Sequence, residues 1–179
     1  MLHKKKIIII IFIIASLLGI FLFAPVGTAL VFYEKNTNEL AAFKPIEIGD
    51  KFQIIFTHSI HLTDVAEKYI VTENLDIQQY EIVYEEFGIG MPANAGEGET
   101  FVYEDGKYHV RDLENYFASM KIRNGKTVSE NRFLWESNSG QEHMVWFNDY
   151  FDPGDWFTVK VEKITLWKYV RGEIGRAHV

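Results

Sequence analysis

The chain has 179 residues, 47% of them hydrophobic and 24% charged, which suits one globular domain with its own core. It has no cysteine, which excludes disulfides, thiolate metal sites, cysteine nucleophiles and lipid-modified cysteines. The first 29 and last seven residues hold four of the 18 basic residues and one of the 25 acidic residues, which leaves 14 bases and 24 acids between them. A net charge of −10 there argues against nucleic-acid binding, which needs phosphate-neutralising Lys and Arg.

Three lysines, at positions 4–6, precede an uncharged apolar run over residues 7–23. As a helix this run is about 25 Å long, and continuing it through Ala29 reaches the roughly 30 Å of a hydrocarbon core. We predict that residues 1–29 are an uncleaved membrane anchor or a signal peptide cut after Ala29. The run is longer than the usual signal-peptide core, which favours the anchor. Lysines stay in the cytoplasm, so the domain is expected outside the cell membrane, or secreted if the leader is cleaved.

The other end of the chain has a different character. Residues 173–179 resemble the translation of a sequencing-adapter read-through, so we predict a non-native tail and exclude it from the fold. A single extracytoplasmic domain is therefore expected over residues 30–172.

This domain has the pattern of β structure. Alternating or β-branched runs over residues 30–34, 40–48, 51–57, 66–75 and 77–87 are separated by turn residues. Explicit turn signals at Asp105-Gly106 and Asn124-Gly125 divide later runs that extend to residue 170. No stretch after residue 33 shows a helical period over twelve residues, although residues 111–120 could hold a short helix. Strands at this spacing predict an all-β fold, an antiparallel β-sandwich or partly open barrel, behind one N-terminal transmembrane or signal helix.

Two short motifs are the most distinctive part of the sequence. Phe56-Thr57-His58-Ser59-Ile60 is followed by Glu67, and then by Phe87-Gly88-Ile89-Gly90-Met91-Pro92. An aromatic residue before His-Ser-[Val/Ile], a Glu eight or nine positions later and Phe-Gly-x-Gly-x-Pro resemble a bacterial family, the exported domain of unknown function 1850. The chain departs from the usual small residue between the two glycines, because it has Ile89 there.

The resemblance implies a role beside a transporter. Such domains are commonly encoded next to TRAP-type transporters of the TAXI class, whose membrane subunits work with an extracytoplasmic solute-binding protein. It therefore implies an accessory or binding component, with transporter subunits or a small anionic solute as partner, and it implies no particular reaction.

The residues of the first motif can also be interpreted from strand geometry alone, without the family resemblance. His58 and Ser59 point to opposite faces of a strand, so they cannot act directly on each other as base and nucleophile. His58 shares a face with Phe52, Ile54 and Phe56, which favours a half-buried ring. Glu67 opens the next strand in this reading and is the expected carboxylate partner of His58 across the hairpin. Ligand recognition, proton transfer and half of a metal site remain alternatives for such a pair.

The second motif predicts a tight bend. Gly88 and Gly90 indicate a positive φ or a close approach of the backbone, and Pro92 ends the ladder. The alternative is a nest of N–H groups that binds an anion. Our candidate ligand-binding residues are His58, Ser59, Glu67, Phe87, Gly88 and Gly90.

No catalytic residue, metal or cofactor is assigned from the sequence. The acidic run at Asn148, Asp149, Asp152 and Asp155 does not match the twelve-residue calcium loop, and His61, His109 and His143 fall on different elements. The leading hypothesis is a membrane-tethered binding component of a TRAP-type transporter. The alternatives are a cell-surface hydrolase that uses His58 or Glu67, and an envelope adhesion or structural module.

Overall fold

The computed structural model describes residues 2–35, 37, 39–137 and 140–169, and the predicted tail at 173–179 lies outside these residues. The chain begins with helix α1 (Leu2–Phe23). The next elements are β1 (Pro25–Glu34), β2 (Leu40–Pro45), β3 (Lys51–Thr57), β4 (Asp64–Val71), β5 (Ile77–Tyr84) and β6 (Thr100–Glu104). They are followed by β7 (Lys107–Phe117), β8 (Met120–Arg123), β9 (Arg132–Glu136), β10 (Glu142–Trp146), the 3₁₀ turn η1 (Phe147–Asp149), β11 (Trp156–Thr165) and α2 (Leu166–Tyr169).

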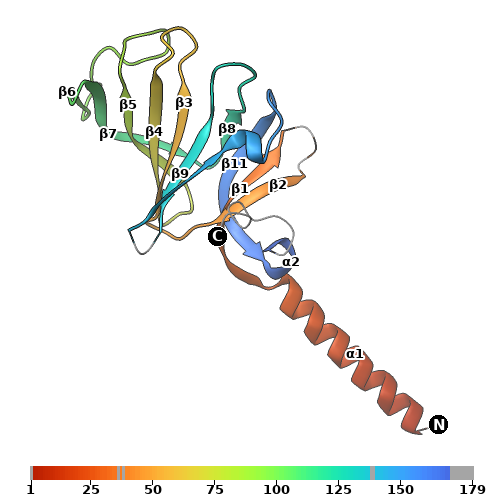
Figure 1. Ribbon diagram of the computed structural model, residues 1–179. Helices are drawn as coiled ribbons and strands as arrows, with labels where there is room; N and C mark the ends of the chain where they lie inside the picture. The colour runs from red at the N-terminus through yellow and green to blue at the C-terminus, as the bar shows by residue number, and fades with distance from the viewer. Residues whose placement is uncertain (1, 36, 38, 138–139, 170–179) are drawn as a thin grey trace.

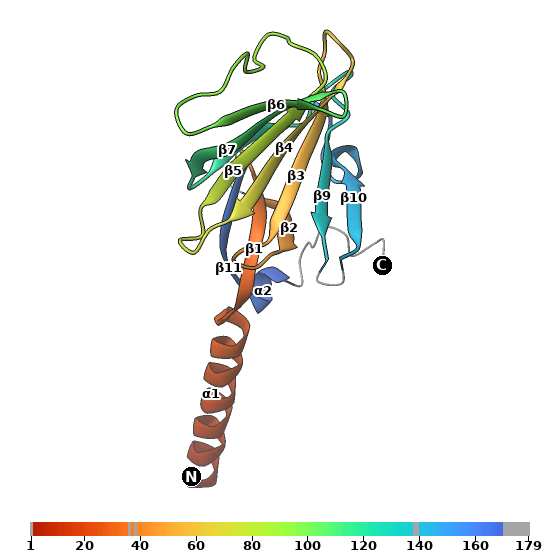
Figure 2. The ribbon, with the colours of Figure 1, turned by 90° about the vertical axis from the view of Figure 1, so that its left-hand side faces the viewer.

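The strands form two antiparallel sheets that pack face to face as a β-sandwich, which confirms the predicted fold class (Figures 1 and 2). The small sheet has the order β2-β1-β11-β8, and the large one the order β10-β9-β3-β4-β5-β7-β6. Every strand pairing between the described residues is antiparallel. The alternation of apolar and polar residues gives each sheet one inward face, and burial of these two faces holds the sheets together.

Aromatic rings fill the space between the sheets. Phe32 of β1 is fully buried and meets the ring of Phe133 edge-on, with centroids 6.2 Å apart. The ring of Phe52 lies 5.6 Å from Phe133 and stacks on Tyr69 at 5.1 Å. Such pairs add to the burial of apolar area, so this cluster joins the small sheet to the large one.

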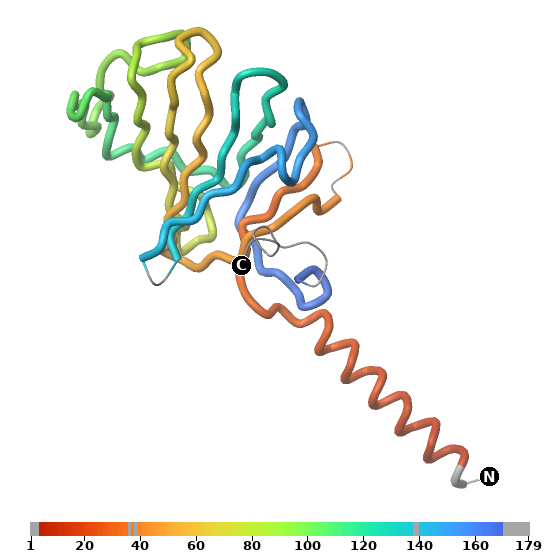
Figure 3. Tube along the Cα trace, in the orientation of Figure 1, coloured from red at the N-terminus to blue at the C-terminus, as the bar shows by residue number. Residues whose placement is uncertain are grey.

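The first strand starts earlier than the sequence suggests. We expected a strand from residue 30, but β1 begins at Pro25, with only Ala24 between it and α1. Figure 3 shows the trace passing from the helix into the domain. Its first residues pair with the end of β11, and Ala29 is completely buried. The apolar leader hides this boundary, because β1 continues the same uncharged composition.

Residues 111–120 do not hold a short helix. Most of this stretch is β7, which pairs with both β5 and β6. Asp112 has a φ of +61°, and the β5–β7 register shifts beside it, between Gln79 and Glu81. This irregularity interrupts the two-residue alternation and leaves a spacing that resembles a helix. The Asp105-Gly106 hairpin is confirmed, with positive φ at both residues.

Candidate functional site

The two sequence motifs form one surface at the end of the sandwich farthest from α1 (Figures 1 and 2). His58 follows β3 directly and starts the loop to β4, residues 58–63, where its N–H donates to the carbonyl of Thr63. The second motif lies in the long β5–β6 loop, residues 85–99. We call these two segments the loop pair. A hydrogen bond joins them, between Nε2 of His58 and the carbonyl oxygen of Ile89, 3.3 Å apart.

The ring of His58 is held on both sides. Its Nδ1 accepts a hydrogen bond from the backbone N–H of Ile60, with the two nitrogens 3.3 Å apart. Its Nε2 must then carry the hydrogen that is donated to Ile89, which defines a neutral tautomer. The residue is only 8% exposed, and its ring stacks on His61 with centroids 5.2 Å apart. His58 therefore holds the two loops together.

His61 and Glu86 belong to this surface, although neither lies within the two sequence motifs. Nδ1 of His61 lies 2.9 Å from a carboxylate oxygen of Glu86, so each loop supplies one partner of the contact. The three-residue spacing between His58 and His61 is a weak signal in a loop, where no helical period brings such residues together.

The two glycines of the second motif are needed for different reasons. The carbonyl of Gly88 accepts the N–H of Met91 at 3.0 Å, and Gly90 sits inside this turn with a φ of +91°. Side chains other than that of glycine are disfavoured at this φ. At Gly88 glycine is required because two imidazole rings lie against the backbone. A Cβ there would be 2.9 Å from Nε2 of His61 and 3.0 Å from Cε1 of His58. The predicted tight bend is confirmed.

We expect Gly88→Ala to destabilise the loop pair. The added methyl group must displace two packed imidazole rings, and overpacking of this kind costs about 1–3 kcal/mol. The matched control is Gly27→Ala, because a Cβ at Gly27 meets no atom within 4 Å. Thermal unfolding and the imidazole NMR resonances of His58 and His61 provide the measurement. An unchanged spectrum and melting temperature for Gly88→Ala would contradict the packing described here.

Glu67 does not partner His58, which corrects our expectation. β4 begins at Asp64, so Glu67 is the fourth residue of that strand and stands opposite Ile54, four residues before His58. Its carboxylate accepts a hydrogen bond from the hydroxyl of Tyr69 at 2.8 Å. Burial raises the pKa of Glu67, and this hydrogen bond opposes the shift. The residue belongs to the inward face of the large sheet, away from the loop pair.

The loop pair presents apolar residues to solvent. Ile89, at the tip of the turn, is 84% exposed, and Ile60 and Leu62 are exposed on the neighbouring loop. Phe87 is partly exposed and packs against Tyr108, with ring centroids 4.2 Å apart. Ser59 is exposed but makes none of the contacts described. The β5–β6 loop also carries four acidic residues and no basic ones: Glu85, Glu86, Glu97 and Glu99.

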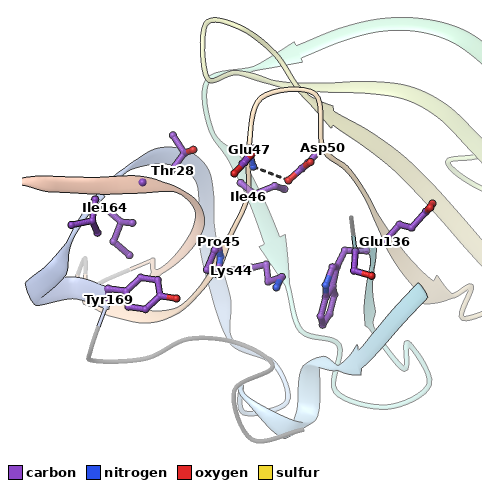
Figure 4. Close-up of a pocket in the computed structure, with 13 residues that line it drawn as sticks. Thr28, Lys44, Pro45, Ile46, Glu47, Asp50, Glu136, Ile164 and Tyr169 are labelled. Atoms are coloured by element: carbon purple, nitrogen blue, oxygen red, sulfur yellow. Dashed lines mark hydrogen bonds between the residues drawn. The ribbon is translucent and has the colours of Figure 1, made fainter. Parts of the chain in front are cut away.

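A separate pocket lies beside the start of β1, at the end of the domain close to α1. Figure 4 shows residues that line it. It has a volume of about 540 Å³, within the usual range for small-molecule sites. Nζ of Lys44 lies 4.7 Å above the ring of Trp135, and the N–H of Glu47 donates to the carboxylate of Asp50 at 2.7 Å. No sequence pattern predicts this pocket, because its lining comes from separate stretches of the chain.

The acidic run after β10 lines another cavity, of about 310 Å³. The side-chain oxygen of Asn148 accepts a hydrogen bond from Asn124 at 2.9 Å, and the carbonyl of Asp152 accepts one from the same amide group at 3.2 Å. Among the residues that the structure describes, no three His, Asp or Glu side chains are grouped so that they could hold a metal ion.

Comparison with known proteins identifies the family. Residues 52–141 match the profile of the domain of unknown function DUF1850. The chain belongs to this family. No curated protein and no solved structure matches it.

The matched region separates the two candidate sites. It runs from β3 past β9 and contains both members of the loop pair in full. Of the residues that line the 540 Å³ pocket, it contains only Trp135, Glu136 and Ser137. The part of this chain that defines the DUF1850 family therefore forms the loop pair and contributes little to the pocket.

Proposed function

We propose that this DUF1850 protein is a membrane-anchored, extracytoplasmic binding component of a TRAP-type transporter of the TAXI class. Among the described residues, one helix, Lys4–Phe23, has 20 residues and a mean hydropathy of 2.9, which is long and apolar enough to cross a membrane. The lysines that precede the apolar run support a cytoplasmic N-terminus and an outward-facing domain. The transporter partner comes from the family resemblance.

The loop pair is the surface that we assign to the partner. The observation that carries this assignment is the apolar tip formed by Ile60, Leu62 and Ile89 within the family-defining region. Both ring nitrogens of His58 and the N–H of Met91 in the bend are already used in internal hydrogen bonds. This favours contact with a protein surface over capture of a small anionic solute. The four carboxylates of the β5–β6 loop suit a partner with a basic rim.

A hydrolase based on His58 and Glu67 has little support. The two side chains come from positions that do not face each other, and neither lines the 540 Å³ pocket. A general base must come within hydrogen-bond reach of its proton, which requires an accessible site. Binding is therefore the better reading of this surface.

Co-purification tests the proposal directly. The tagged full-length protein is isolated from detergent-solubilised membranes of its own host as wild type, as Ile89→Asp and as the control Ile48→Asp. Ile48 is also exposed but lies on the β2–β3 connection near the other end. Wild type and Ile48→Asp are expected to retain the transporter subunits, and Ile89→Asp to lose them by about tenfold or more, as for a central interface residue. Absence of transporter subunits from all three preparations would rule out this partner.

A further inference from the structure

The end of the domain beside α1 carries aromatic residues that the protein does not bury. α2 is a single turn that follows β11, and none of its residues is buried. Trp167 of α2 is 41% exposed, and its ring centroid lies 6.3 Å from that of Phe23, the last residue of α1. Val26, at the start of β1, is exposed beside them. Figures 1 and 2 both show α2 next to the end of α1.

The length of α1 determines the depth of Phe23, Val26 and Trp167 relative to the bilayer. A helix of 20 residues rises about 30 Å, which is the thickness of a hydrocarbon core. The lysines at positions 4–6 mark one boundary of that core, so Phe23, at the end of the uncharged run, lies within about one helical turn of the other boundary. Only Ala24 separates α1 from β1, and its N–H still donates to the carbonyl of Ile20 at 2.8 Å. The chain therefore has no flexible linker that would lift the domain away from the bilayer.

We propose that Trp167, with Phe23 and Val26, seats the domain in the headgroup layer of the bilayer, so that the lipid surface is the partner of this face. Tryptophan favours this layer, because its ring is apolar while its N–H can stay hydrated. The seat is a second attachment beside the helix and holds the domain in one orientation. It depends on the anchor in the proposed function and is independent of the transporter partner.

Tryptophan quenching by lipid tests the seat. The full-length protein is reconstituted into phosphatidylcholine–phosphatidylglycerol vesicles, with and without phosphatidylcholine brominated near the top of one acyl chain. Bromine quenches tryptophan only at short range, so the lipid-accessible emission is the difference between the two vesicle types. The variants are Trp167→Phe and the control Trp156→Phe. Trp156 has a similar exposure of 42% but starts β11, whereas Trp167 follows its end.

The outcomes separate the seat from the anchor. Brominated lipid is expected to quench the tryptophan fluorescence of wild type and of Trp156→Phe. The fluorescence of Trp167→Phe is expected to be the same with and without brominated lipid. If the protein floats with vesicles but all three forms are quenched equally, or Trp156→Phe alone loses the effect, the seat is wrong and the anchor stands. If the protein does not float with vesicles, both are wrong. Near-UV circular dichroism checks that each variant keeps the wild-type fold.

Discussion

A chain that begins at Leu30 is expected to be far less stable than one that begins at Pro25. The shorter chain lacks the first half of β1, where Gly27 pairs with Ile164 and Ala29 with Glu162 of β11. Ile164 is almost fully buried and would lose part of its cover. Several ladder hydrogen bonds at about 1 kcal/mol each, together with this exposure, predict a loss on the order of 3–5 kcal/mol in the free energy of unfolding. Urea denaturation of the two chains measures the difference.

This expectation bears on the fate of the leader. A signal peptidase that cut after Ala29 would remove residues that the sandwich needs, which favours the uncleaved anchor over the signal peptide. Intact mass of the mature protein is expected to show residues 1–29 still present. A mature protein that starts at Leu30 and unfolds at the same urea concentration as the longer chain would contradict both statements.

Replacement of Glu81 is expected to give the second large effect. Its side chain is 9% exposed on the outer face of the large sheet, and it accepts hydrogen bonds from Lys68 at 2.7 Å, His109 at 2.8 Å and Arg111 at 3.0 Å. Glu81→Ala leaves these groups without their shared carboxylate. Breaking a buried pair is strongly destabilising, and partial exposure of the partners moderates the loss to about 2–3 kcal/mol. Glu97→Ala, in the exposed β5–β6 loop, is the control.

The dependence of the free energy of unfolding on pH, measured below about pH 4.5, tests the same contacts of Glu81. Burial alone would raise the pKa of Glu81, but the hydrogen bonds from Lys68, His109 and Arg111 outweigh it and lower the pKa from 4.5 to about 2. The ionised group therefore stabilises the fold above about pH 4.5, and this contribution is lost as the pH falls towards 2. Glu81→Gln is expected to flatten this pH dependence. An unchanged slope would show that the contacts of Glu81 do not stabilise the protein.

The sequence predicted much of the fold because strands carry their own signal. Alternation identified most strands, and a hairpin turn was predicted correctly at Asp105-Gly106. The errors lie where local pattern and tertiary structure diverge. A bulge at Asp112 broke the alternation in β7, and the apolar leader merged with the start of β1 at Pro25.

The candidate site was predicted only in part. The tight bend at Gly88 was predicted correctly, because glycine in a motif signals a backbone constraint, and the structure places His58 against it. The proposed pairing with Glu67 was wrong, because one misplaced strand start changes every cross-strand partner. His61 and Glu86 were missed, because contacts between two loops depend on tertiary structure and leave no periodic spacing in the sequence.

The single residue between α1 and β1 also limits how a partner can meet the loop pair. In the proposed orientation, the ten residues of β11, at about 3.3 Å each, span roughly 33 Å between the end of the domain beside the bilayer and the opposite end. If the seat proposed above holds the domain at this height, the domain encounters other membrane proteins by lateral diffusion in two dimensions. Its search is confined to binding surfaces at the same height, and a soluble subunit must first be brought to that level by the complex that carries it.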